Sequence, residues 1–180
     1  MVLSDFDLVC QIKAVIIMDS NGKRIRSLFY DSALNDFKTE KDKRAFELRL
    51  HEKNKVTNSE LEIIDQYIVV GGKTGDIQVY VVGLNSVNEL ALLDVLNVIT
   101  SLMRRICATE DSSIISKKLL LENYNMLCLY LDEVINDGIV FEVDEDTIVG
   151  RVPLADQSMT DLNNAIELAK ERFSIFTKGR

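Results

Sequence analysis

The chain has 180 residues, a formal net charge of −8 and a hydrophobic fraction of 47%, which is ample for the packed core of one domain. No apolar run approaches the ~18 uninterrupted residues of a membrane-spanning helix, because Asp94 and Asn97 interrupt the best candidate, residues 90–103. Residues 61–180 carry 19 acidic side chains against 10 Lys and Arg, so binding to nucleic acid or directly to anionic lipid is not expected.

The first predicted element is a β-hairpin. Residues 9–18 and 24–30 alternate between apolar and polar side chains and are rich in β-branched residues, which is typical of strands. The pair Asn21-Gly22 between them is a strong hairpin signal, and we expect both residues to adopt positive φ. The charged side chains of the polar run DSNGKR, residues 19–24, should keep this turn in water. The run is therefore interpreted as a turn that carries no chemistry.

A charged helix is predicted next, over residues 36–53, with Phe46 and Leu50 on its apolar side. His51 stands near its end, where a cation that caps the last carbonyls is the natural interpretation. Three further strands should follow as an antiparallel meander, over residues 61–64, 67–70 and 77–82.

The second half of the chain is predicted to be mostly helical. The polar stripe of residues 89–106 is narrow, so this helix should be buried on more than one side, across the sheet and against a helix over residues 116–136. Gly138 should end that second helix. Shorter helical patterns cover residues 146–151 and 160–176. The order β-β-α-β-β-β-α-α is that of an α+β fold, in which helices flank one five-stranded sheet and a C-terminal helix follows.

The catalytic and ligand-binding motifs that the chain suggests do not hold. GGKTG at residues 71–75 lacks the first glycine of a P-loop, since position 67 is Tyr, and a strand rather than a helix follows it. The acidic run over residues 142–146 fits neither register of a calcium-binding loop. His51 is the only histidine, which excludes any site that needs two. We therefore expect no enzyme, no cofactor and no metal.

The three cysteines, Cys10, Cys107 and Cys128, are widely spaced in apolar surroundings, which favours reduced side chains in the core. What remains for function is binding surface, either on the first helix with its adjoining edge strand or on the last helix. Packing onto the domain's own sheet explains both surfaces equally well. The candidate partner-interface residues are Phe46, Leu50, Ile64, Tyr67, Val69, Leu162, Ile166 and Phe173.

Read in order, several segments resemble the zeta small-chain family of coatomer, the COPI vesicle coat. Residues 12–31 look like its opening strand pair, and residues 88–97 resemble its central helix. Residues 119–144 and 148–152 are similar to the stretch that distinguishes this family from its relatives. The segments read IKAVIIMDSNGKRIRSLFYD, NELALLDVLN, LLLENYNMLCLYLDEVINDGIVFEVD and IVGRV. The likeness covers residues 9–153, and we expect a longin-like domain over residues 1–153 with a helical extension over residues 154–180.

The resemblance implies a longin-like fold, shared with the sigma small chains of clathrin adaptors, in which one helix covers one face of the sheet and two cover the other. It also implies a non-enzymatic subunit that pairs obligately with coatomer gamma and joins the other coatomer subunits. Such a coat supports retrograde Golgi-to-ER and intra-Golgi transport. An Arf-family GTPase would recruit it through the larger subunits, so the chain is expected in the cytoplasm and, peripherally, on Golgi membrane and COPI-coated vesicles.

Two alternatives keep the fold and change the role. Sigma chains have a VCELD-like segment near a pocket for dileucine sorting signals. Residues 106–118 read ICATEDSSIISKK instead, so no cargo pocket is transferred, although a sigma-type adaptor chain remains an alternative. The second alternative is a regulatory longin domain of a membrane-fusion protein, which would require a downstream coiled-coil helix and a membrane anchor. The family often has paired glycines where this chain has Asn136-Asp137-Gly138, which leaves the end of the preceding helix open.

Overall fold

The computed structural model describes residues 12–30, 37–57, 60–108 and 115–152. The predicted order of elements is confirmed, while the predicted helix over residues 160–176 and the extension over residues 154–180 lie outside the described residues. The elements are β1 (Ile12–Asp19), β2 (Arg24–Phe29), α1 (Glu40–Thr57), β3 (Leu61–Ile64), β4 (Tyr67–Thr74), β5 (Ile77–Leu84), α2 (Glu89–Cys107), α3 (Lys117–Glu122), α4 (Tyr124–Val134), β6 (Ile135–Asn136), β7 (Ile139–Val140) and α5 (Glu145–Arg151).

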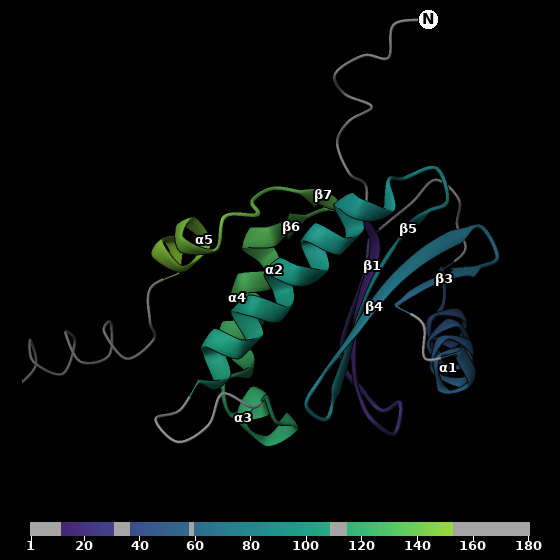
Figure 1. Cartoon of the computed structure of the whole chain (residues 1–180), viewed down its shortest axis with the longest axis horizontal. Helices are drawn as coiled ribbons and strands as arrows, with labels where there is room; N and C mark the ends of the chain where they lie inside the picture. The colour runs from purple at the N-terminus through teal and green to yellow at the C-terminus, as the bar shows by residue number, and fades with distance from the viewer. Residues whose placement is uncertain (1–11, 31–36, 58–59, 109–114, 153–180) are drawn as a thin grey trace, which may run out of the picture.

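One antiparallel sheet organises the molecule, with strand order β2-β1-β5-β4-β3. Figure 1 shows α1 alone on one side of the sheet and α2 with α4 on the other. The sheet therefore has two cores. The larger packs α2 and α4 on one face, and the smaller packs α1 on the other through Phe46 and Leu50. Every residue of β1 is buried, because this strand lies inside the sheet and is covered on both faces.

Strand β4 extends beyond its predicted end at Val70 and includes the first two glycines of the GGKTG run, Gly71 and Gly72. A Cβ on Gly71 would come within 2.6 Å of Tyr80 Cδ1, and one on Gly72 would lie 3.4 Å from Leu96 Cδ2. The two glycines therefore leave room for a tyrosine ring on one face and for α2 on the other. The turn itself is the pair Gly75-Asp76, so the rejection of a P-loop agrees with the structure.

The β1–β2 turn differs from its prediction in two respects. Gly22 has a φ of 76°, as expected. Asn21 is not among the residues with positive φ, so the prediction was wrong for Asn21. The N–H of Gly22 donates to the Asp19 carbonyl, and the N–H of Asp19 donates to the Lys23 carbonyl, each at 2.9 Å. This is a longer loop than a two-residue turn, and glycine takes the left-handed position. Asp19, which was expected in water, is buried.

The helix predicted over residues 116–136 is two helices and a strand. The chain breaks at Asn123, whose side-chain Nδ2 and backbone N–H both donate to the Leu119 carbonyl at the end of α3, at 3.0 and 3.2 Å. After α4 the chain leaves the helix at Ile135 and enters the β6–β7 hairpin. Gly138, predicted to end a helix, instead forms the turn of this hairpin, and its carbonyl accepts from the Ile12 N–H at 2.7 Å.

Candidate partner interface

Five of the eight candidate interface residues lie in the described part of the chain, and all five are at most 6% exposed. They pack together in the smaller core between α1 and the sheet, where the rings of Phe46 and Tyr67 are 5.8 Å apart in an edge-on arrangement. Their role in a partner interface stays a prediction, as it does for Leu162, Ile166 and Phe173, which lie outside the described residues. The five are Phe46, Leu50, Ile64, Tyr67 and Val69.

The apolar side chains that do face solvent near this region belong to β3. Leu61 is 46% exposed and Ile63 is 60% exposed, whereas Glu62 between them is buried. Leu61 pairs with Val70 and Ile63 with Ile68, so these side chains share the sheet face that α2 covers. Helix α2 covers this face of the sheet as far as β4 but does not reach β3, so the two β3 side chains face solvent. We call Leu61 and Ile63 the β3 margin.

Sequence reasoning missed the β3 margin. The alternation in LEII, residues 61–64, does indicate two faces, but the charged residue at position 62 favours the opposite assignment, with Glu62 in water. A one-residue change of register would exchange the two faces. The register that this chain adopts therefore buries a carboxylate and exposes two large apolar side chains, which is the composition expected of a surface that another chain covers.

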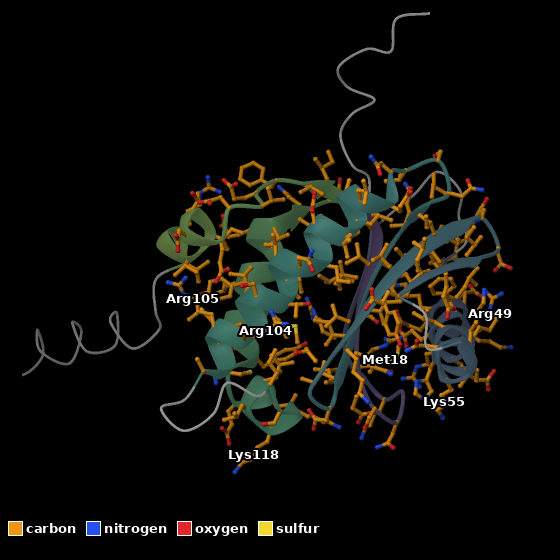
Figure 2. All side chains as sticks on the ribbon, viewed as in Figure 1. Met18, Arg49, Lys55, Arg104, Arg105 and Lys118 are labelled. Atoms are coloured by element: carbon orange, nitrogen blue, oxygen red, sulfur yellow. The ribbon has the colours of Figure 1, made fainter. Side chains whose placement is uncertain are left out.

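Helix α1 occupies part of the outer backbone edge of β3. The Lys53 ammonium donates to the Ile63 carbonyl, and the Arg49 guanidinium forms an ion pair with Asp65 at 2.7 Å. A lysine that occupies an edge carbonyl opposes the addition of another strand. In Figure 2, Arg49 and Lys55 lie at the surface of α1, on the side of the sheet away from α2. A partner chain at the β3 margin would therefore contact side chains rather than pair with the strand.

The segment that corresponds to the cargo region of sigma chains, residues 106–118, is described only in part. At its end, the Lys117 ammonium lies 2.7 Å from Asp19 Oδ2, and the Lys117 N–H donates to Asp76 Oδ1 at 2.8 Å. Burial alone would raise the pKa of Asp19, but hydrogen bonds from Lys117 and from the backbone of Lys23 and Asn21 outweigh it and hold this pKa below its usual value. The carboxylate is therefore charged and fully used within the chain.

The prediction that His51 caps a helix end was wrong. Helix α1 continues to Thr57, and His51 is only 4% exposed, with its ring against the β1–β2 turn. A Cβ on Gly22 would lie 2.5 Å from His51 Cδ2, so only glycine leaves room for the ring. Neither ring nitrogen has a hydrogen-bond partner in the described part of the chain.

The remaining charged and sulfur-containing candidates have structural roles. Asp144, in the acidic run over residues 142–146, caps α5 by accepting from the Thr147 N–H at 2.9 Å. Glu133 pairs with Arg151 at 3.6 Å. Cys107 is buried and Cys128 half-buried, both as free thiols, and Cys10 lies outside the described residues.

The described ranges contain no group of three or more His, Cys, Asp or Glu arranged to hold a metal ion. Among the helices of the same ranges, none has the length and apolar character needed to cross a bilayer.

Comparison with known proteins agrees with this architecture. A family model described as "Clathrin adaptor complex small chain" matches residues 11–159. The chain is 53% identical over 177 residues to the probable coatomer subunit zeta-B of Dictyostelium discoideum, covering 96% of this chain and 98% of that one. It is 30% identical over 168 residues to coatomer subunit zeta-1 of Homo sapiens, covering 89% of each. It is also 30% identical over 148 residues to coatomer subunit zeta of Saccharomyces cerevisiae, covering 78% and 76%.

A chain in a homology model of the full-length AP-3 complex, in a stretched open conformation, superimposes with a TM-score of 0.57. The match covers 89% of this chain and 98% of that one at 18% identity, so it supports the fold alone. The family match spans most of the chain, and the relatives of 30% identity or more cover most of its length. This chain belongs to the clathrin adaptor complex small chain family and, within it, to the coatomer zeta subunits.

Proposed function

We propose that this chain is a non-enzymatic small subunit of the COPI coat that pairs with coatomer gamma. In this role it would support retrograde Golgi-to-ER and intra-Golgi vesicle transport. The observation that carries the pairing is the β3 margin, where Leu61 and Ile63 face water while Glu62 is buried. An apolar margin beside a partly occupied backbone edge is suited to side-chain packing against a larger subunit.

The net charge of the chain agrees with recruitment to the membrane through other subunits of the coat. A net charge of −8 opposes direct docking on anionic lipid. The proposal therefore assigns membrane contact to the assembled coat and to an Arf-family GTPase that binds the larger subunits. The chain itself would be cytoplasmic and would reach Golgi membrane and COPI-coated vesicles only within the coat.

Co-expression with coatomer gamma tests the pairing. We expect a stoichiometric complex and a higher melting temperature for this chain than it has alone, because a partner that binds only the folded state stabilises it. The double variant Leu61→Ser/Ile63→Ser should weaken the complex at least about tenfold, since two buried aliphatic side chains each contribute about 1 kcal/mol or more to an interface.

The matched control is Leu121→Ser/Leu129→Ser, which removes two leucines that are each 48% exposed on α3 and α4. This control should leave the affinity within about twofold, as near-neutral surface changes do. Failure of the unaltered chain to form any complex would overturn the proposed function. If only the control variant weakened binding to coatomer gamma, the proposed function would stand, but the β3 margin would not be part of the interface.

A further inference from the structure

A second feature of α1 is a groove between this helix and the β1–β2 turn, with a volume of about 530 Å³. We call it the α1–hairpin groove. It lies beside the turn rather than beside β3, so it is separate from the β3 margin. Its lining residues are Gly22, Lys23, Arg24, Arg44, Glu47 and Leu48.

The single acid among these lining residues is already neutralised. Glu47 is buried, and its carboxylate lies 2.9 Å from Arg24 Nε and also accepts from the Ser27 hydroxyl. Arg24 reaches a second carboxylate, Glu40, at 3.1 Å. Arg24 is therefore a structural cation that joins β2 to α1, and Glu47 contributes little free negative charge to the groove.

The other two cations remain uncompensated. Lys23 and Arg44 are exposed, and neither forms an ion pair with a carboxylate of the described residues. One stands on the turn and the other on α1, so they approach the groove from both sides. In a chain with a net charge of −8, this is a locally positive surface that attracts an anionic group.

The groove also has an apolar part. Leu48 is 58% exposed, one helical turn after Arg44 on the same face of α1. Gly22 keeps the turn close to the helix, because any larger residue would meet the buried His51 ring. The groove thus combines two free cations with one exposed aliphatic side chain, contributed by the β1–β2 turn and by α1.

We propose that the α1–hairpin groove binds a segment of the partner subunit in which a carboxylate stands next to an apolar side chain. This inference rests on the proposed function. The carboxylate lies between Lys23 and Arg44, and the apolar side chain packs on Leu48. A single protein carboxylate fits better than a phosphate-rich membrane surface, because the chain as a whole is acidic and opposes the approach of an extended anionic surface.

The test measures the affinity of the purified chain for coatomer gamma with the double variant Lys23→Glu/Arg44→Glu. Like charges placed across an interface are strongly unfavourable, so the dissociation constant should rise at least about tenfold. The loss relative to the unaltered chain should shrink at high salt, which screens exposed charges. Thermal unfolding of the free variant should match that of the unaltered chain, because both side chains are exposed.

The control Lys41→Glu/Lys73→Glu makes the same change of net charge at exposed lysines outside the groove. It should bind within about twofold of the unaltered chain. If both double variants weakened binding to coatomer gamma equally, or if neither did, the proposed role of the groove would be wrong, although the proposed pairing would stand. Absence of any complex with the unaltered chain would overturn the proposed function and the groove together. If the groove variant lost only binding to vesicles of anionic lipid, the occupant would be a membrane and the proposal would be wrong.

Discussion

Lys117, at the start of α3, forms an ion pair with Asp19, at the end of β1, with 2.7 Å between Nζ and Oδ2 and 98 residues between them in sequence. The Lys117 backbone N–H also donates to Asp76 in the β4–β5 turn. One residue therefore connects two turns of the sheet to the helical layer. The Asp19 side chain is 8% exposed and that of Lys117 is 33% exposed, so the pair is partly screened by solvent.

Replacing Lys117 by Met should lower the free energy of unfolding by about 1–2 kcal/mol, because a mostly buried carboxylate loses its charged partner but keeps two backbone donors. Urea unfolding at pH 7 measures the change. Lys118→Met is the matched control, since that side chain is 84% exposed and its ion pair with Glu122 is long, at 3.9 Å. The control should change stability by less than about 0.5 kcal/mol. Equal effects of the two variants would contradict the role of the pair.

The same pair predicts a loss of stability in acid. The pKa of Asp19 in the folded chain lies below its ordinary value of 3.8, so its stabilising effect is complete above that value. It is lost as the pH falls through the lower, folded pKa. The difference in the free energy of unfolding between the unaltered chain and Lys117→Met should therefore be constant from pH 7 to about pH 5. It should become smaller below about pH 4. A gap that stays constant to pH 3 would argue against a charged Asp19 as its source.

The raised pKa of Tyr80 leads us to expect a loss of stability at alkaline pH. Burial raises the pKa of Tyr80 to about 12, although Asn54, which donates to the tyrosine hydroxyl at 2.6 Å, acts to lower it. A raised folded pKa means that stability is intact below pH 10 and is lost as the pH rises from 10 towards 12. Tyr80→Phe should lose about 1 kcal/mol less than the unaltered chain over this range, measured by urea unfolding at pH 9, 10 and 11. Parallel losses in both proteins would contradict the prediction.

The fit of Tyr80 against β4 predicts a large effect at Gly71. Gly71→Ala should destabilise the chain by about 1–3 kcal/mol, because the added Cβ meets the tyrosine ring at 2.6 Å. Gly150→Ala is the control, since no atom lies within 4 Å of its added Cβ and the residue is in α5. That change should be neutral or stabilising by up to about 1 kcal/mol. Thermal unfolding of both variants checks the difference, and a tolerated Gly71→Ala would show that the ring moves aside easily.

The sheet could be predicted from the sequence because each strand carries a local signal. Alternation with a period of two and the turn pairs located all five strands of the main sheet, and the narrow polar stripe located α2 to within one residue. The likeness to small coat chains then supplied the arrangement of the helices on the two faces. The bounds of the strands and of α2 depend on neighbouring residues in the chain, so no tertiary information was needed to locate them.

What escaped prediction depends on contacts between distant segments. The burial of His51 requires the β1–β2 turn to pack on α1, and the exposure of Ile63 depends on how far α2 extends across the sheet. The break at Asn123 has no strong local signal in the sequence, and the Leu119 carbonyl accepts there from both the backbone and the side chain of Asn123. Residues that pack α1 on the sheet and residues on a partner surface share the same apolar composition, so composition alone does not distinguish the two.

The two faces of the sheet hold cores of unequal size, which gives the molecule unequal resistance to local unfolding. Detachment of α1 would disrupt only the smaller core and leave the α2–α4 core in place. Amide hydrogen exchange should therefore be faster in α1 than in α2 or β1. An excursion of this kind uncovers Phe46 and Leu50 without global unfolding, so binding at α1 would slow exchange there first.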